Sequence, residues 1–183
     1  MRKRRIWHRT ASLALAGTIL LSGLSIPLSA KEPTVQDDGL VLYYDMERVE
    51  DGILLDATGH LDATIHGAAA QVGSFRGKAL QFDGGDDYVE LAPALQEKLA
   101  GMTAFTVSAF VKLDELRGYQ RIFDWGNGQN SFQCMIAPST NAWNSGLCYD
   151  TSNTGGGEAN EQLISAPEGL KAGEWFHVAV SQD

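Results

Sequence analysis

The sequence predicts an all-β fold with two antiparallel sheets, and three features of the chain carry this prediction. Short runs alternate between apolar and polar residues, as strands with one buried face do. Turn residues separate these runs, for example at 84–85, 127–128 and 155–157. Helical periodicity is confined to the segment 93–99. Many short strands with such punctuation favour a sandwich or a barrel.

The first thirty residues read as a secretory signal peptide. A basic head precedes an apolar run, and the small residues Leu28-Ser29-Ala30 approximate a cleavage site. An uncleaved membrane anchor is the alternative, but Ser, Gly and Pro interrupt the apolar run, which is shorter than the ~20 residues of a spanning helix. We expect a signal peptide at 1–30, a linker at 31–38 and one domain at 39–183.

The remaining chain is strongly acidic. Five of the 14 basic residues and none of the 23 acidic residues lie in the first thirty, so nine basic residues face 23 acidic ones and the net charge is −14. Nucleic acid and anionic membranes are therefore not expected partners.

Ten strands are expected along the domain. The clearest is AFTVSAFVKL, where Phe105, Val107, Ala109, Val111 and Leu113 fall on one face at a period of two. The expected strands are, in order, 41–46, 63–66, 79–82, 88–91, 105–113, 120–125, 131–137, 146–151, 161–165 and 175–181.

Three hairpins are predicted by register. In ALQFDGGDDYVEL, a tight turn at 85–86 would gather Leu80, Phe82, Val89 and Leu91 on one face. In FDWGNGQNSF, an Asn-Gly turn at 127–128 is expected to bring the phenylalanines at 123 and 132 opposite each other.

The third hairpin concerns the two cysteines. Cys134 and Cys148 lie symmetrically about Asn141, so a hairpin centred there would set them opposite one another, within reach of a disulfide. In an exported chain with two cysteines a bridge is the expected state, and two buried free thiols are the alternative.

These segments resemble the laminin-G-like, concanavalin A-like jelly rolls attached to many secreted bacterial glycoside hydrolases. The resemblance rests on KALQFDGGDDYVEL, FTVSAFVKLDEL, QRIFDWGNG and AGEWFHVAV, in that order, and covers residues 39–183. It implies an antiparallel two-sheet jelly-roll sandwich. The chain stops at HVAVSQD, where similar domains add further strands, so we expect an incomplete domain of a longer protein.

A catalytic site is not expected in this segment, although the parent protein could be a glycoside hydrolase. Glucanases of this fold carry a Glu-x-Asp-x-(x)-Glu strand, which projects alternate carboxylates into one cleft, and the sequence has no such run. Histidines 60, 66 and 177 stand without a nucleophile elbow or a metalloprotease helix.

Calcium is the cofactor that the resemblance allows. Hard cations bind carboxylate and carbonyl oxygens, and the loops between strands supply both. The candidate ligands are Asp45, Asp56, Asp86 and Asp87. The alternative is that aspartate is simply a good turn residue.

Exposed aromatic rings are the candidates for sugar binding, because the C–H face of a sugar packs on such a ring. Trp143 lies in the polar loop NAWNSG, Trp125 adjoins an Asn-Gly turn, and Tyr119 lies in ELRGYQR. Trp143 could instead cap its own hairpin. We expect a secreted or cell-surface, non-catalytic module that either binds a neutral polysaccharide or serves as an accessory to a covalently linked glycoside hydrolase domain. The alternative is a cell-surface adhesion module that binds protein.

Overall fold

A computed structural model describes residues 39–127, 130–141, 144–156, 159–166 and 169–183. The expected signal peptide and linker lie outside these residues. The chain divides into two compact units, one ending at Ala92 and one beginning at Pro93, and each is described by itself. Within the described residues no helix is long and apolar enough to span a membrane.

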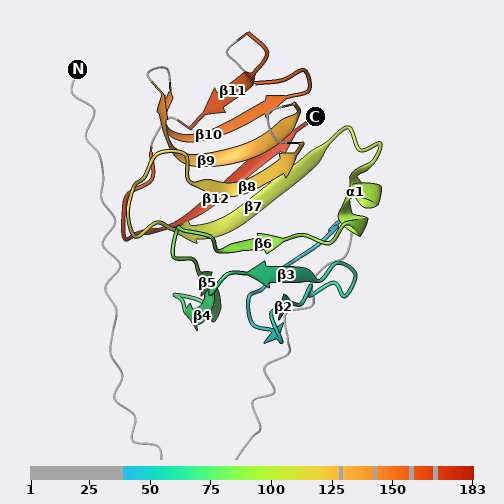
Figure 1. Ribbon diagram of the computed structural model, residues 1–183, viewed down its shortest axis with the longest axis vertical. Coiled ribbons are helices and arrows are strands. Elements are labelled where there is room, and N and C mark those ends of the chain that lie inside the picture. Colours follow the sequence, from blue (N-terminus) through green and yellow to red (C-terminus); the bar gives the residue numbers. More distant parts are fainter. Residues whose placement is uncertain (1–38, 128–129, 142–143, 157–158, 167–168) are drawn as a thin grey trace, which may run out of the picture. The chain divides into compact units, whose positions relative to one another are not determined.

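The first unit contains a four-stranded antiparallel sheet in the order β1-β2-β3-β6, of which Figure 1 labels β2, β3 and β6. Its strands are β1 (Val49–Glu50), β2 (Ile53–Leu54), β3 (Ala63–His66) and β6 (Tyr88–Glu90). The turn between β1 and β2 is Asp51-Gly52, and both residues have positive φ, 49° and 79°. This is the conformation that a two-residue hairpin turn of an Asp-Gly pair requires.

A separate hairpin in this unit pairs β4 (Ala70–Gly73) with β5 (Lys78–Gln81). The predicted pairing of residues 79–82 with 88–91 is therefore wrong. Strand β5 pairs with β4, the strand before it in the sequence. Strand β6 pairs with β3, so Val89 lies opposite Ile65. The predicted strand at 41–46 is also not formed, because residues 41–45 have no regular structure.

The second unit begins with helix α1 (Ala94–Leu99) and contains two antiparallel sheets. The larger one has the order β11-β10-β9-β8, and the smaller one pairs β7 (Phe105–Lys112) with β12 (Trp175–Gln182). The strands of the larger sheet are β8 (Arg121–Gly126), β9 (Phe132–Asn141), β10 (Asn144–Ser152) and β11 (Gln162–Ser165).

The core of this unit lies between its two sheets, and Figure 1 shows the β7–β12 pair behind the larger sheet. Strand β7 alternates strictly between half-buried and exposed residues, which confirms the predicted period. Val178 and Val180 of β12 pack with Met135 and Tyr149 of the larger sheet. The fold is mostly β with antiparallel sheets, as predicted.

The hairpin of β9 and β10 exists, but its register overturns the predicted disulfide. A bulge between Gly146 and Cys148 shifts the pairing, so that Cys148 lies opposite Ile136 and Cys134 lies opposite Asp150. Both cysteines are buried, and they form no disulfide with each other. They are diagonal neighbours on one face, a position in which Cβ atoms are farther apart than in direct cross-strand pairs.

The β8–β9 hairpin also forms with a register other than the predicted one. Phe132 pairs with Gly126, and Phe123 pairs with Met135. The Asn127 amide donates to the Ser131 carbonyl at 2.8 Å. The connection therefore closes between residues 127 and 131 and is longer than the predicted two-residue turn at 127–128.

Candidate functional site

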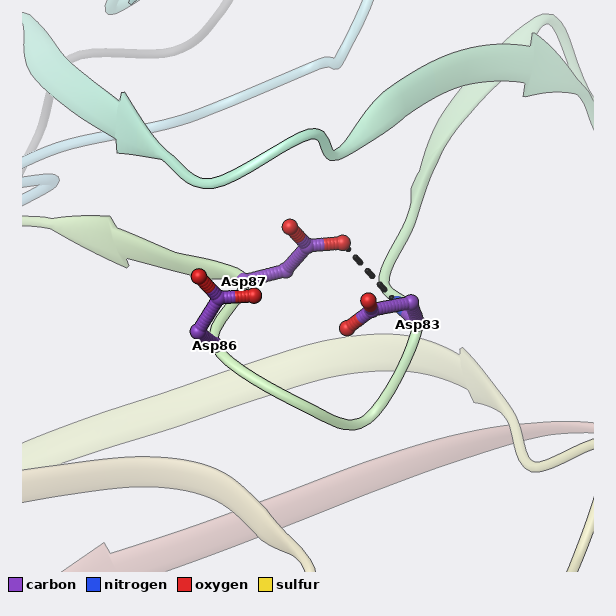
Figure 2. A group of neighbouring side chains, drawn as sticks. All are labelled: Asp83, Asp86 and Asp87. Atoms are coloured by element: carbon purple, nitrogen blue, oxygen red, sulfur yellow. Dashed lines mark hydrogen bonds between the residues drawn. The ribbon is translucent and has the colours of Figure 1, made fainter.

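Three aspartates form an acidic loop between β5 and β6, and we use this name for Asp83, Asp86 and Asp87. Each offers a carboxylate oxygen, and the three oxygens lie within 4.8 Å of one another (Figure 2). Asp83 and Asp86 are exposed and Asp87 is half-buried. The sequence analysis named Asp86 and Asp87 as ligands but missed Asp83, although all three lie within the same short loop.

Backbone amides hold the acidic loop in shape. Asp87 accepts hydrogen bonds from the amides of Asp83 at 2.9 Å and Ala68 at 2.5 Å, and Asp83 accepts one from Gly85 at 2.7 Å. Figure 2 shows the first of these bonds closing the loop. The three carboxylates are therefore positioned by hydrogen bonds to the loop backbone and not by a β-strand.

The acidic loop could hold a metal ion. Calcium binds oxygens at 2.3–2.6 Å, so two oxygens on opposite sides of it lie about 5 Å apart. The oxygens of the three aspartates fit within this span. Three neighbouring carboxylates repel each other, and a divalent cation removes most of that repulsion.

The other two predicted metal ligands lie elsewhere and bind the backbone. Asp45 accepts a hydrogen bond from the Glu47 amide at 2.9 Å. Asp56 is 2% exposed and organises the loop that follows β2. Its two oxygens accept five hydrogen bonds, from the amides of residues 43, 58, 60 and 61 and from the Thr58 hydroxyl.

The hydrogen bonds of Asp56 also determine its ionisation. Burial raises the pKa of this carboxyl, but the bonds donated by Thr58, Tyr43 and His60 outweigh burial, so the pKa lies below its usual value. A carboxylate has about four lone-pair sites. Five donors occupy them, so we assign Asp56 a structural role.

A second candidate site lies at the start of β8, and we call Tyr119, Arg121 and Asp124 the Tyr119 cluster. Tyr119 is 51% exposed and has a φ of 63°, which is uncommon for a bulky residue. Arg121 donates to the Tyr119 carbonyl at 3.3 Å and to the Asp124 carboxylate at 3.0 Å. The guanidinium therefore ties the aromatic residue to the strand.

The segment around Tyr119 is fixed on both sides. The Arg117 amide donates to the Gln120 side chain at 2.8 Å, and the Ala137 amide of β9 donates to the Gln120 carbonyl at 2.8 Å. These bonds hold the unusual conformation, and strained exposed residues of this kind are found at functional sites. The cluster combines an exposed ring with a cation and an anion.

Asp150 lies in the same sheet as this cluster, in a row with Cys134 and Asp124. Asp124 pairs with Cys134 across β8 and β9, and Cys134 pairs with Asp150 across β9 and β10. Asp150 is 8% exposed, and its Oδ1 has no hydrogen-bond partner among the described residues. A buried carboxylate oxygen without a donor costs free energy.

Burial also changes the ionisation of this row. Burial raises the pKa of Asp150 to about 6. The negative charge of Glu161 also raises this pKa, and the positive charge of Arg121 lowers it. Burial raises the pKa of Cys134 to about 12, so its sulfur is a neutral thiol at neutral pH. Cys134 therefore has the character of a core residue and not of a nucleophile.

The two predicted tryptophan sites differ from Tyr119 in their surroundings. The ring of Trp125 packs against Phe123 at a centroid distance of 4.8 Å and against Phe105 of β7 at 5.9 Å. It therefore contributes to the contact between the two sheets of the second unit. Trp143 lies outside the described residues.

Comparison with known proteins agrees with the fold. A family model, Laminin_G_3, described as the concanavalin A-like lectin/glucanases superfamily, matches residues 83–183, more than half of the chain. No curated protein matches the chain.

One solved structure is similar to this chain over much of its length. It is the crystal structure of an S-layer domain-containing protein from Clostridium thermocellum, with 26% sequence identity and a TM-score of 0.55. The similarity covers 73% of this chain and 60% of that one, less than two thirds of the solved structure. Because the family model spans the whole second unit and the sheets have the expected antiparallel form, the chain belongs to the concanavalin A-like lectin/glucanases superfamily.

Proposed function

We propose that this chain is a non-catalytic glycan-binding module of an exported or cell-surface protein, and that the Tyr119 cluster contacts the sugar. The observation that carries the proposal is the Tyr119 ring, which is 51% exposed in a conformation that its neighbours enforce. A tyrosine that served packing alone would gain more from burial, since apolar area contributes about 25 cal/mol per Å² when buried.

The chemistry of the cluster suits a neutral sugar. The C–H face of a pyranose packs on an aromatic ring, while charged groups at the edge exchange hydrogen bonds with its hydroxyls. Arg121 offers donors and Asp124 offers acceptors, and the two side chains are 39% and 51% exposed. Acidic polysaccharides are disfavoured, because residues 31–183 carry a net charge of −14.

The superfamily supports a glycan as the ligand, and the similar solved structure supports a location at the cell surface. The superfamily includes lectins by name, and the similar chain is called an S-layer domain-containing protein, which points to a cell surface. We propose a signal peptide at 1–30, a linker at 31–38 and the binding domain at 39–183, within a longer protein that carries a glycoside hydrolase domain.

We further propose that the acidic loop binds calcium. The loop supplies three carboxylates, and Asp83 and Asp86 remain exposed. The Asp83 Oδ2 atom and both carboxylate oxygens of Asp86 accept no hydrogen bond from the described residues, so they can face a cation. The ion would fix the connection that leads into β6 and would leave the Tyr119 cluster to contact the sugar.

Affinity electrophoresis tests the proposal. The full chain is run through gels that contain xylan, hydroxyethyl cellulose or mixed-linkage β-glucan, beside its Tyr119→Ala and Trp143→Ala variants. We expect at least one polysaccharide to retard the chain and Tyr119→Ala to lose the retardation. Tyr43→Ala is the matched control, because Tyr43 is 44% exposed and lies in the other unit.

Two results would contradict this proposal. Unchanged mobility of the parent chain in every gel, together with capture of a protein from the cell surface, would favour the adhesion alternative. Release of reducing sugar by the chain itself would show that the module is catalytic.

A further inference from the structure

Strands β3 and β6 of the first unit present a polar and aromatic face. Ala63 is 1% exposed, and Ile65 and Val89, which lie opposite each other, are half-buried. Because successive residues of a strand point to opposite faces, the residues between them share the other face. That face holds Thr64, His66, Tyr88 and Glu90.

His66 and Tyr88 form a stacked pair on this face. They are direct cross-strand partners, and their ring centroids lie 4.5 Å apart with an interplanar angle of 10°. The His66 Nε2 atom lies 2.8 Å from the Glu90 carboxylate. The imidazole is thus held by a ring on one side and by a hydrogen bond at its edge.

The stack remains open to solvent. Tyr88 is 52% exposed, the Glu90 side chain is 60% exposed, and the Tyr88 hydroxyl has no hydrogen-bond partner among the described residues. An exposed contact between a histidine and a carboxylate contributes little to stability, and a stacked pair contributes about 1 kcal/mol. The exposed stack therefore contributes less to stability than a buried ring would, but it holds the Tyr88 ring in one orientation at the surface.

We propose that His66, Tyr88 and Glu90 form a second glycan-binding site, which takes one neutral pyranose residue. The sugar packs its C–H face on the exposed part of Tyr88 and donates a hydroxyl to Glu90. The tyrosine hydroxyl supplies a further hydrogen bond. Because the stack already fixes the ring, little conformational entropy is lost when a ligand binds.

Charge narrows the ligand class. The Glu90 carboxylate is the acceptor at this site, and residues 31–183 carry a net charge of −14. A uronic acid or a sulfated sugar would meet like charges here, whereas a neutral hexose or pentose would not. The site rests on the proposed function for the class of ligand, but it uses none of the residues of the Tyr119 cluster.

Two sites on one chain would bind a polymer more tightly than either alone. When one site is occupied, the second binding step becomes intramolecular and its effective concentration can reach millimolar values. We therefore expect long polysaccharides to be retained more strongly than hexasaccharides, and loss of either site to weaken retention of the polymer by roughly tenfold or more.

Nuclear magnetic resonance of the full chain with labelled histidines tests the second site. The His66 ring signal is followed during titration with xylohexaose, cellohexaose and chitohexaose. The matched control in the same spectrum is His177, whose ring packs on Phe110 at a centroid distance of 4.9 Å. We expect a saturable shift of His66 with one of these sugars and a smaller or absent shift of His177.

Variants separate this inference from the proposed function. Tyr88→Ala should abolish the His66 shift, and Tyr88→Phe should retain it with weaker binding, while the signal of His60, whose amide donates to Asp56 in the same unit, reports that this unit is folded. Absence of a saturable His66 shift with all three sugars, or its persistence in Tyr88→Ala, would overturn the second site. If His66 responds in the parent chain while Tyr119→Ala leaves polysaccharide retention unchanged, the second site stands and the Tyr119 cluster is refuted.

Discussion

At the scale of single residues, Tyr119 combines a backbone conformation that costs stability with the role in sugar binding that we propose for its ring. A bulky residue at a φ of 63° is strained, and this one is also 51% exposed. Burial of the side chain does little to offset the free-energy cost of this strained backbone. We therefore read the conformation as the means by which the ring is directed outward.

The first prediction compares two substitutions at this position. Glycine adopts positive φ without the steric cost that alanine retains, a difference of about 1 kcal/mol. Tyr119→Gly should therefore have a free energy of unfolding about 1 kcal/mol above that of Tyr119→Ala. Urea denaturation measures it, and a more stable alanine variant would show that the backbone is not strained there.

Asp150 is a second residue whose position in the fold lowers the free energy of unfolding. Its Oδ1 lacks a donor within the described chain, and burial raises the pKa of the carboxyl from 3.8 to about 6. Between about pH 4 and pH 6 the unfolded chain has lost this proton while the folded chain still binds it, so stability falls as the pH rises through that window. Above pH 6 the loss is complete.

The second prediction follows from that direction. Asp150→Asn should be more stable than the parent chain above pH 6, by up to about 3 kcal/mol, and should lose most of this advantage near pH 4. Thermal unfolding at a series of pH values measures the difference. A constant difference at every pH would contradict the assignment to Asp150, and Asp114→Asn on the exposed surface is the control.

At the scale of elements, the loop after β2 depends on one buried carboxylate. Asp56 accepts five hydrogen bonds, and its pKa lies below the usual value because these bonds outweigh burial. Its contribution is present above its unfolded pKa and is lost as the pH falls through the folded value. The loop is thus stabilised at neutral pH.

The third prediction removes that carboxylate. Asp56→Ala should lower the free energy of unfolding at pH 7 by about 3 kcal/mol or more, because several buried amides lose their acceptor. Asp45→Ala, which removes one exposed hydrogen bond, should cost less than about 1 kcal/mol. Equal costs for the two variants would contradict the structural role of Asp56.

Elements with a strong local pattern could be predicted from the sequence, and their partners could not. The alternation of residues 105–113 places β7 correctly because one strand contains all the information. The turn at 84–86 favoured a hairpin on local burial, yet β5 and β6 each pair with a strand earlier in the chain. Partner choice depends on the whole sheet, which no local register reveals.

The cysteines illustrate the same limit at the level of register. Symmetry about Asn141 assumed a regular hairpin, but the bulge between Gly146 and Cys148 moves the partner of Cys134 to Asp150. A bulge inserts one extra residue and cannot be counted from spacing. The place of Asp150, whose Oδ1 atom lacks a donor among the described residues, was missed for this reason, since only the true register sets it in a row with Asp124.

The candidate sites were predicted in part. The acidic loop was visible because its aspartates are close in sequence, whereas the His66–Tyr88 stack joins residues far apart that meet only through the β3–β6 pairing. Tyr119 was named from its polar surroundings, but its positive φ and its bond to Arg121 are properties of the folded chain.

At the scale of the whole molecule, bound calcium should stabilise the fold. If the ion binds only the folded chain, calcium at 100 times its dissociation constant adds about 2.7 kcal/mol to the free energy of unfolding. The fourth prediction is that chelation lowers the melting temperature of the parent chain but not that of Asp86→Asn. An Asp45→Asn control should respond like the parent, and an unchanged melting temperature in the parent would remove the calcium proposal.

The central claim is that the chain holds a neutral polysaccharide through the Tyr119 cluster, and affinity electrophoresis of Tyr119→Gly beside the parent chain tests it most directly. Because glycine relieves the strain at this position, lost binding cannot be attributed to unfolding. Our account predicts retardation of the parent by at least one of xylan, hydroxyethyl cellulose and β-glucan, and its loss in Tyr119→Gly. Equal retardation of the two proteins, or none of the parent in any gel, would contradict the account.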